Sequence, residues 1–253
     1  MVDEPGGRAQ RGAAAEDDDL AASLEGLALL ATRRRGLDEV LTSVATFAVR
    51  AIPRADGAGL TLLEQGRSNT VVATEAFVRE VDDIQYGLGQ GPCISAAAEG
   101  RTVRSGSLGG DARWQQFGSR VARLGVHSVI SLPLVTGEGV LGAMNVYARA
   151  KDVFGDRAQE LGELFAVPAA VAVQNAQTLA EAQRLVHQLQ AAVSSRGVID
   201  RAVGIMISRS GGSERDALDR LRAVSMNERR PLAVVAQQLV DETIRRRRNR
   251  HDG

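Results

Sequence analysis

The feature that most constrains this chain is an unbroken helical repeat that begins near residue 172. Alternating intervals of three and four separate Ala172, Asn175, Leu179, Ala182, Val186, Leu189 and Val193. This spacing is typical of a coiled-coil seam. A helix that packs back on its own domain is the alternative, but polar residues such as Arg184 and His187 occupy its other faces. The pattern favours a parallel homodimer through residues 172–193, in which Asn175 fixes the register.

The repeat leads into a second pattern at residues 194–208. On a helical wheel, one broad face is apolar and carries Val198, Ile199, Ala202, Val203, Ile205, Met206 and Ile207. The opposite narrow face carries Ser194, Gly197, Arg201, Gly204 and Ser208. A glycine inside a helix costs about 1 kcal/mol relative to alanine, so two glycines on one face indicate that something approaches closely. Two partners fit this face. One is a nucleic-acid backbone that contacts Arg201, and the other is a second helix, for example where the dimer seam continues into this segment.

Charge is unevenly distributed along the chain. Residues 195–253 hold 13 Arg and 8 acidic residues, whereas residues 1–194 hold 18 basic and 23 acidic residues. The basic C-terminal part indicates a polyanion-binding region, although an offset of this size also occurs by ordinary surface variation. Lys151 is the only lysine and lies in Ala-Lys-Asp, which excludes a P-loop and the usual lysine-dependent catalytic sites.

Cysteine usage and hydropathy point to the cytoplasm. Cys93 is the only cysteine, so no intramolecular disulfide forms, and a reducing compartment is expected. The first 20 residues are acidic and lack the apolar core of a signal peptide. The longest apolar run, residues 164–173, contains Pro168 and is too short to span a membrane. We therefore expect a cytoplasmic protein without a membrane partner.

The first two thirds of the chain alternate between helical and strand patterns. Helices are predicted at 20–34, 37–52, 77–86, 113–124 and from Pro92 to about Gly100, and strands at 58–63, 70–76, 102–108, 127–135 and 140–149. This order predicts an α+β domain on an antiparallel sheet with flanking helices. From Asp156 onward the pattern is helical. Gly211-Gly212 ends the long helix, Ser213 and Asp216 predict a capping box, and Pro231 opens a third helix.

The C-terminal part resembles the ANTAR domain. The matching residues are Ser195 to Ile207, Ala217, Leu221-Arg222, Ser225, Asn227, Leu232 and Val235-Ala236. The resemblance covers about residues 189–244 and implies an all-α three-helix module on a coiled-coil stem. Such domains bind paired hairpin loops in nascent RNA as dimers and promote transcription antitermination. Two positions depart from the pattern: Val203 replaces a lysine that many members carry, and Arg229 replaces a common asparagine.

The preceding part is similar to the GAF domains that are fused to ANTAR domains in actinobacteria. The matching stretches are 87–93, 111–114, 124–134 and 142–147, within a span of about 37–174. The resemblance implies a sensor for an unknown small-molecule signal. The predicted organisation is a disordered acidic tail at 1–19, a GAF-like sensor domain at 20–168, a coiled-coil signalling helix at 169–193 and an RNA-binding domain with a basic tail at 194–253.

Arginine is expected to dominate RNA recognition. Residues 195–253 contain no Phe, Tyr or Trp, so no aromatic side chain there can stack on a base. Recognition would then depend on the shape of the RNA and on contacts with its phosphates. The predicted RNA-binding residues are Arg196, Arg201, Gly204, Arg209, Arg222, Arg229 and Arg230. Each arginine could equally be a solvated surface charge, and residues 245–250 a nonspecific polyanion contact. RNA polymerase would be a further partner of an antitermination regulator.

The predicted ligand-pocket residues of the sensor domain are Cys93, Arg113, Trp114 and His127. Structural roles compete for them, because a lone cysteine is commonly a buried thiol and a tryptophan a core anchor. No third group orients Cys93 and His127 as a catalytic pair, and the three histidines lack metal-ligand spacing. We therefore predict no enzyme activity, no metal and no cofactor.

Two glycine motifs have competing interpretations. Gly137–Gly142 matches G-x-G-x-x-G but lies between two predicted antiparallel strands, which favours a hairpin turn over a dinucleotide site. Gly87–Gly91 precedes a helix and forms either an anion-binding loop or a tight turn. Two other function classes also stay open: a DNA-binding regulator with a GAF sensor, and a thiol-dependent GAF enzyme.

Overall fold

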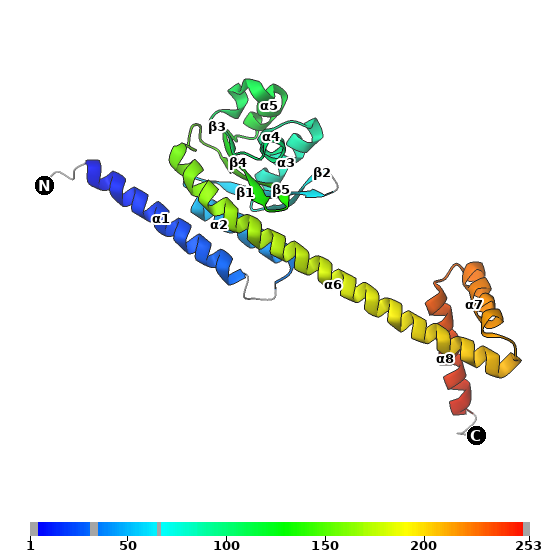
Figure 1. Cartoon of the computed structure of the whole chain (residues 1–253). Coiled ribbons are helices and arrows are strands. Elements are labelled where there is room, and N and C mark those ends of the chain that lie inside the picture. Colours follow the sequence, from blue (N-terminus) through cyan, green and yellow to red (C-terminus); the bar gives the residue numbers. More distant parts are fainter. Residues whose placement is uncertain (1–4, 31–34, 65–66, 250–253) are drawn as a thin grey trace. The chain divides into compact units, whose positions relative to one another are not determined.

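The N-terminal unit is built on a five-stranded antiparallel sheet with helices on both faces (Figure 1). The computed structural model describes residues 5–30, 35–64 and 67–249, and the chain divides into units at 1–180 and 181–253. Each unit is described by itself. The strands follow the order β2-β1-β5-β4-β3. Their bounds are Gly57–Glu64 (β1), Arg67–Ala73 (β2), Val103–Ser105 (β3), Ser128–Thr136 (β4) and Gly139–Ala148 (β5).

The hairpin of β4 and β5 confirms the strand pair that was expected from alternation. Its turn separates Thr136 from Gly139, so the G-x-G-x-x-G match lies in a hairpin, as predicted. β5 also pairs with β1, where a Cβ at Gly142 would collide with the backbone oxygen of Thr61. This glycine therefore permits close strand packing rather than ligand binding.

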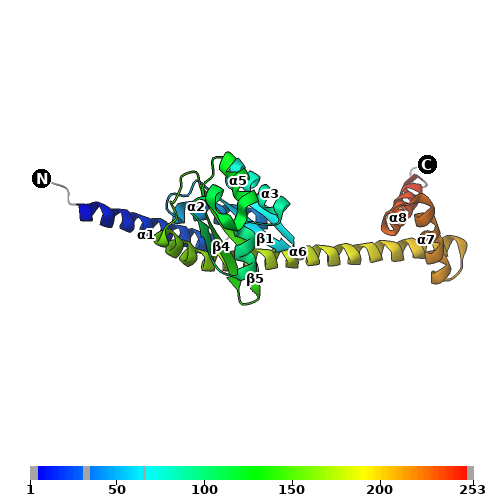
Figure 2. The ribbon, with the colours of Figure 1, turned by 90° about the horizontal axis from the view of Figure 1, so that it is seen from above.

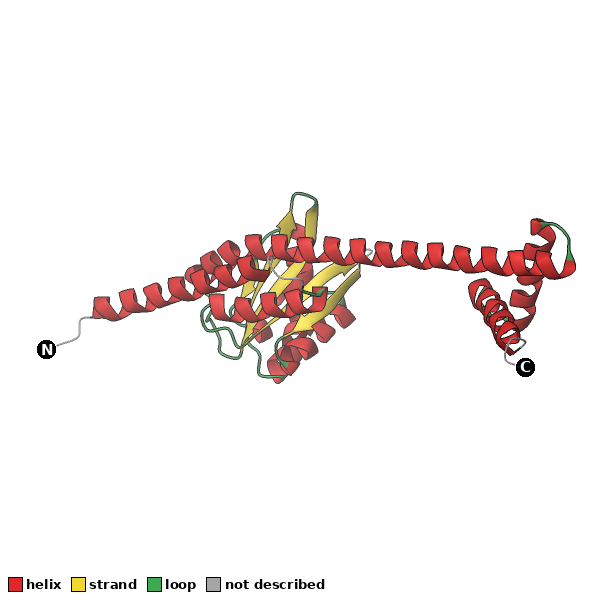
Figure 3. Cartoon of the chain, turned by 90° about the horizontal axis from the view of Figure 1, so that it is seen from below, coloured by secondary structure: helices red, strands yellow, loops and turns green. Residues whose placement is uncertain are grey.

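Three helices cover one face of the sheet: α1 (Pro5–Leu30), α2 (Leu37–Ala51) and the first turns of α6 (Asp156–Ser210) (Figure 3). The apolar face predicted for α2 is buried, with Leu41 and Val44 fully enclosed. Leu161 and Phe165 of α6 are fully buried in the same core. Burying each such side chain stabilises the fold by about 1.5–3 kcal/mol, so this layer fixes α6 on the sheet.

The opposite face carries α3 (Ala76–Leu88), α4 (Pro92–Glu99) and α5 (Gln115–Arg123), as Figure 2 shows for α3 and α5. Pro92 is the first residue of α4, as predicted. Two 3₁₀ turns, Leu108–Gly110 and Ala112–Trp114, precede α5. The strand predicted at 102–108 is therefore too long, because the chain leaves the sheet after β3 and the Leu108 amide donates to the His127 carbonyl (2.8 Å).

The prediction of a disordered tail at 1–19 is wrong for residues 5–19, which belong to α1. Residues 1–4 lie outside the described part. The acidic run carries charges that pair with arginines elsewhere in the unit: Asp19 with Arg50 (2.9 Å) and Asp17 with Arg157. The alanine-rich composition favours helix, and the same helix is anchored by Leu20, Leu27 and Leu30, which are buried in the core of the unit. The exposed pairs add little to this.

The core of this unit also extends past the predicted boundary at residue 168. Ala169, Ala170 and Val173 are buried in it, and Ala172 packs against it. Ala172 therefore faces its own domain rather than the predicted dimer seam. Pro168 lies inside α6, which continues as one helix to Ser210. No helix within residues 5–30, 35–64 and 67–249 combines the length and apolarity needed to cross a membrane.

The second unit packs the end of α6 against α7 (Glu214–Glu228) and α8 (Leu232–Asn249). Gly211 adopts a left-handed conformation (φ 67°) just after α6 and ends it as predicted. The predicted capping box is present: the Asp216 amide donates to Ser213 Oγ (3.2 Å), and the Ser213 amide donates to Asp216 Oδ2 (3.1 Å). The core of the unit is formed by Ala202, Val203, Ala217, Leu221, Val235, Ala236 and Val240.

Candidate nucleic-acid interface and sensor site

The narrow small-residue face of α6 is open to solvent within its unit. Gly197, Arg201 and Gly204 are exposed, and a Cβ at either glycine would meet no atom within 4 Å. The predicted apolar face of the same segment is the one that packs on α7 and α8, and Val203 is 6% exposed. Contact with a helix of the same unit therefore does not explain the glycines.

Four of the predicted arginines have no ion pair within the described residues: Arg196, Arg201, Arg209 and Arg229. The Arg201 Nε donates to the Gly197 carbonyl one turn earlier (3.1 Å), which holds the guanidinium along the glycine face. Arg209 donates to the Thr243 hydroxyl of α8 (2.8 Å). Arg229 ends α7 in a left-handed conformation (φ 51°). Their charge is available to an anionic partner.

The other two predicted arginines are paired with acidic neighbours. Arg222 contacts Asp219 on the same helix (3.1 Å), and Arg230 contacts Glu228 (3.0 Å). Both pairs are exposed, and such pairs contribute little, so a phosphate can replace the carboxylate. The sequence interpretation missed Arg220, which donates to the Ser210 hydroxyl at the end of α6 (3.3 Å). Its position four residues after Asp216 on α7 gave no sign of that contact.

A second candidate site is a buried polar cluster in the first unit, between the sheet and helices α3 and α4. Its members are Thr61 (β1), Asp82, Gln85 and Tyr86 (α3), Cys93 (α4), Ser131 (β4), and Asn145 and Tyr147 (β5). The Tyr147 hydroxyl donates to Asp82 Oδ1 (2.6 Å), and Asn145 Nδ2 donates to the same oxygen (3.3 Å). Tyr86 bonds to the Thr61 hydroxyl and lies 3.8 Å from the Cys93 sulfur.

Three buried polar atoms of this cluster lack a hydrogen-bond partner among the described residues. They are Gln85 Nε2, Asn145 Oδ1 and Ser131 Oγ, and the side chains of Ser131 and Asn145 are neighbours because the residues pair across β4 and β5. Each unsatisfied buried group costs about 1–3 kcal/mol. Such groups in native proteins are normally met by water or a ligand. The cluster therefore has donors and acceptors that water or a small polar ligand can satisfy.

Burial governs the ionisation of the cluster. It raises the pKa of the Cys93 thiol to about 11, and the nearby Asp82 charge adds to the effect. Burial likewise raises the pKa of Tyr147 well above its usual value. A thiol that stays protonated at neutral pH is a poor nucleophile, which argues against thiol-dependent catalysis here. Within the described residues, no three His, Cys, Asp or Glu side chains form a group that could hold a metal.

The structure does not bring the four predicted pocket residues into one cavity. Cys93 belongs to the buried polar cluster, whereas Trp114 is a core residue whose Nε1 donates to the Ser95 hydroxyl (3.3 Å). Arg113 lies 4.2 Å above the Trp114 ring and lines a surface hollow of about 700 Å³ to which the other three do not contribute. His127 precedes β4, and its backbone donates to the Ala148 carbonyl at the end of β5 (3.0 Å) and accepts from the Leu108 amide (2.8 Å).

Arg113 is largely engaged within its own loop. It donates to both carboxylate oxygens of Asp111 (3.0 and 2.7 Å) and to the Arg104 carbonyl (2.7 Å). These hydrogen bonds lower the pKa of Asp111 to about 2. The arginine therefore stabilises the loop between β3 and α5.

The glycine-rich loop before α4 is a tight turn. Gly89 adopts a left-handed conformation (φ 63°) at the end of α3, and a Cβ at Gly91 would collide with the Gln85 side chain. Gln85 Oε1 accepts from the Cys93 amide (2.8 Å), so it already satisfies an amide at the start of α4. The turn interpretation of Gly87–Gly91 is the one that the structure favours over anion binding.

Sequence and structure comparisons agree with this geometry. A family model of the GAF domain matches residues 34–174, and one of the ANTAR domain matches residues 187–240. The chain resembles the structure of a GAF sensor protein from Burkholderia vietnamiensis (19% identity, TM-score 0.51), with 66% of this chain and 98% of that chain covered. It also resembles the GAF domain of a phosphoenolpyruvate-protein phosphotransferase from Coxiella burnetii (14% identity, TM-score 0.50), with 63% and 95% covered. At these identities the likeness shows the fold alone. No curated protein matches the chain.

The first match spans more than half of the chain and covers the sheet and its helices except α1. The second covers the end of α6, α7 and the first half of α8. The chain belongs to the GAF-domain family and carries an ANTAR domain behind its GAF domain, which is the architecture of a GAF–ANTAR regulator.

Proposed function

We propose that this protein is a signal-responsive regulator that promotes transcription antitermination by binding paired hairpin loops in nascent RNA as a dimer. The observation that carries the proposal is the exposed face of α6 on which Gly197 and Gly204 flank Arg201, with open space at both glycines. Bare backbone there allows an RNA phosphate to come close, and the guanidinium supplies the charge. RNA polymerase is the complex on which such a regulator acts.

The arginines around this face extend the interface. Arg196, Arg209 and Arg229 lack acidic partners among the described residues, and Arg222 and Arg230 have only exposed ones. Guanidinium groups can hold unstacked loop bases, and their positive charge binds the phosphates. Arginine therefore compensates for the missing aromatic side chains. Val203 is buried, so it leaves the RNA face without the lysine that many ANTAR domains carry.

The dimer forms through α6 at residues 175–193 of the predicted seam, since Ala172 packs on the core of its own domain. Leu179, Val186, Leu189 and Val193 of the predicted seam are 45–74% exposed in one chain, which supports a partner helix at this place. A parallel pair of α6 helices presents two RNA-binding faces. Two faces on one dimer suit two hairpin loops on one transcript.

The GAF domain senses a small polar molecule at the buried polar cluster. The unpaired atoms of Gln85, Asn145 and Ser131 offer it a donor and acceptors. The sheet that carries Asn145 also packs on α6 through its other face, so a ligand that shifts β5 acts on the signalling helix. Ligand binding thus changes the pairing of the two α6 helices and the presentation of RNA.

A gel-shift titration of the full chain against transcripts with two tandem hairpins tests this function. The Arg201→Glu variant is expected to lose affinity by at least tenfold, since one phosphate contact is lost and repulsion replaces it. Arg123→Glu, an equal charge change at an exposed position of α5, is the matched control and should bind as the native chain does. Gly204→Leu is expected to weaken binding without loss of stability, because nothing within the unit fills that space.

Four outcomes would contradict the proposal. Binding that ignores the hairpin loops, or that survives both Arg201→Glu and Gly204→Leu, removes RNA from this face. Tighter binding to duplex DNA than to hairpin RNA makes the protein a DNA-binding regulator instead. Equal loss in Arg123→Glu shows that net charge alone drives the interaction.

A further inference from the structure

The surface hollow beside Arg113 lies at the edge of the sheet, where β3, the loop after it and the segment before α6 meet. Its volume is about 700 Å³, which is large enough for a small molecule. Polar groups such as Ser107, Arg113 and Asp152 line it, together with the apolar side chain of Phe154. It shares no residue with the buried polar cluster and is therefore a separate site.

Asp152 brings to this hollow a negative charge that nothing in the described part of the chain neutralises. Its side chain makes no ion pair and no hydrogen bond with a described residue. A Cβ at Gly106 would collide with Asp152 Oδ1, so the carboxylate lies against bare backbone there. An ionised carboxylate forms its strongest hydrogen bonds with cationic donors. The hollow therefore offers a site for an ammonium or guanidinium group.

The backbone that carries this carboxylate is fixed by hydrogen bonds. The Asp152 amide donates to the Gly106 carbonyl (2.9 Å), and the Ser128 hydroxyl donates to the carbonyls of Gly106 (3.2 Å) and Ala150 (2.8 Å). Asp152 adopts a left-handed conformation (φ 53°), which Asp and Asn tolerate better than other side chains. A ligand therefore meets a group that is already in place, which lowers the cost of binding.

Arg113 and Ser107 supply donors on the same hollow. Arg113 uses Nε and Nη2 for Asp111 and Nη2 also for the Arg104 carbonyl, so its Nη1 has no partner among the described residues. Those bonds hold the guanidinium in one orientation. The Ser107 hydroxyl likewise makes no hydrogen bond with a described residue. A guanidinium N–H and a hydroxyl are both donors for a carboxylate.

We propose that this hollow is a ligand site of its own and that it takes a small zwitterion, an amino acid, whose ammonium group pairs with Asp152 and whose carboxylate is held by Arg113 and Ser107. A ligand with a single charge leaves one side of the hollow unpaired. A phosphate compound is disfavoured, because hydrogen bonds from Arg113 lower the pKa of Asp111 to about 2 and keep a second negative charge there. The site involves neither the RNA face nor the buried polar cluster, so it stands or fails separately from the proposed function.

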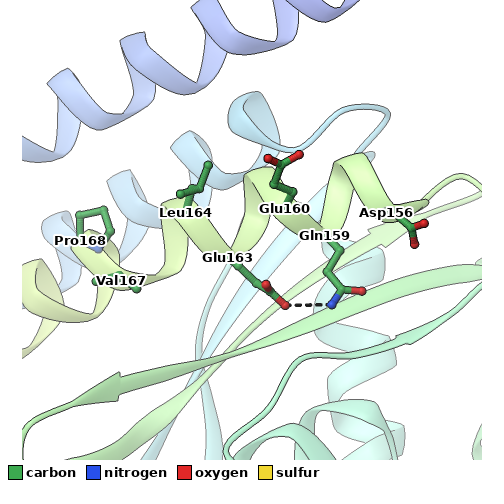
Figure 4. A pocket seen from close by; sticks show the side chains of 7 residues that line it. All are labelled: Asp156, Gln159, Glu160, Glu163, Leu164, Val167 and Pro168. Atoms are coloured by element: carbon green, nitrogen blue, oxygen red, sulfur yellow. Dashed lines mark hydrogen bonds between the residues drawn. The ribbon is translucent and has the colours of Figure 1, made fainter.

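Arg104 connects the hollow to the first residue of α6. It lines the hollow, and its Nη2 donates to Asp156 Oδ1 (2.6 Å). Figure 4 shows the Asp156 side chain at the start of the helix. This side chain is 96% exposed, and an exposed pair of this kind is weak and readily exchanged. An amino acid in the hollow therefore lies beside the contact that ties β3 to α6.

Fluorescence titration of the full chain with the common L-amino acids, one at a time, tests the site. Trp114 is the only tryptophan, and the Arg113 guanidinium lies 4.2 Å from its ring centroid, so a ligand on Arg113 changes its emission. We expect a saturable change with at least one amino acid. Its amide, which lacks the carboxylate, and its N-acetyl derivative, which lacks the ammonium group, should bind at least tenfold more weakly.

Two matched variants locate the site. Asp152→Asn removes the charge and keeps a residue that tolerates the left-handed backbone, and it should raise the dissociation constant at least tenfold. Asp18→Asn, the same change at an exposed position of α1, should bind as the native chain does. Isothermal titration calorimetry measures the same constants without Trp114 as the reporter, and circular dichroism establishes that both variants are folded.

Absence of calorimetric binding by every amino acid at millimolar concentration overturns the proposal. Equal binding of the amide or of the N-acetyl derivative shows that only one charge is recognised, and it also overturns the proposal. An amino acid that binds the native chain and Asp152→Asn equally well occupies another site, the buried polar cluster included. An equal loss in Asp18→Asn assigns the effect to net charge. Either result contradicts a role for this hollow.

Discussion

Replacing Tyr147 by Phe should destabilise the GAF domain by a calculable amount. The Tyr147 hydroxyl donates to the Asp82 carboxylate at 2.6 Å, and both residues are fully buried. Phe fills the same space, so the change removes one hydrogen bond without making a cavity. A hydrogen bond to a charged group contributes about 1.5–3 kcal/mol, and this sets the expected loss of unfolding free energy.

A domain of this size loses about 2–4 °C in Tm for each kcal/mol, so the Tm should fall by about 3–12 °C. Trp114 is the only tryptophan and lies in the core next to the buried polar cluster, so its fluorescence follows the unfolding of this domain alone. The melting curve of the full chain can therefore be assigned to the GAF domain without interference from the ANTAR domain.

The Asp82→Ala background supplies the control. There the Tyr147 hydroxyl has lost its acceptor, and Tyr147→Phe should cost less than about 0.5 kcal/mol, as for independent sites. An unchanged Tm for Tyr147→Phe in the native background would refute the assigned role of the hydrogen bond. So would an equal loss in both backgrounds, because the cost would then come from packing.

Three further predictions concern Cys93 and the capping box of α7. Burial holds the pKa of Cys93 at about 11, so the thiol in the native protein should react with a disulfide reagent far more slowly at pH 8 than in the urea-unfolded chain; equal rates would contradict its burial. This pKa lies above the ordinary thiol value of 9.0, so the neutral thiol stabilises the fold fully below pH 9, and this contribution is lost between pH 9 and 11. Urea unfolding of the native and Cys93→Ala chains over this pH range measures the loss. Ser213→Ala removes a capping hydrogen bond of α7 and should cost the ANTAR domain about 0.5–2 kcal/mol in urea unfolding. Ser208→Ala, an exposed helical position without a cap, is its control and should change little.

Local patterns predicted much of the fold because local physics decides those parts. The apolar face of α2, the β4–β5 hairpin and the Ser213–Asp216 capping box depend on periodicity or on residues three positions apart. The prediction for residues 5–19 was wrong, because they belong to a helix whose Leu20 and Leu27 pack in the core and whose acids pair with Arg50 and Arg157 from distant segments. A pairing over such a separation leaves no trace in a local window.

The candidate sites show the same division. The glycine–arginine face of α6 could be read from helical spacing, and its apolar counterpart packs as expected. The buried polar cluster was missed except for Cys93, because its members come from five elements. One signal was present: Asp82 and Gln85 lie at helical spacing from Val78 on a face whose neighbours are apolar. Polar residues at such positions indicate a buried polar site.

Ala172 illustrates a limit of periodicity. Its spacing from Asn175 fits a seam, but the residue packs on the GAF core, whereas Val171 takes the exposed place. When a helix carries two apolar faces, spacing alone cannot assign a residue between them to either face. Only the contact with the sheet shows to which face such a residue belongs.

Pro168 sets where α6 is most easily deformed. Because proline has no N–H, the Leu164 carbonyl receives no hydrogen bond from the next turn, and the ladder of α6 is interrupted there. Bending or partial unwinding of α6 is therefore easiest between residues 164 and 168. The dimer seam proposed for α6 lies beyond Pro168, so pairing of two chains stiffens the helix after this point and leaves the turn beside the sensor core as its most easily bent part.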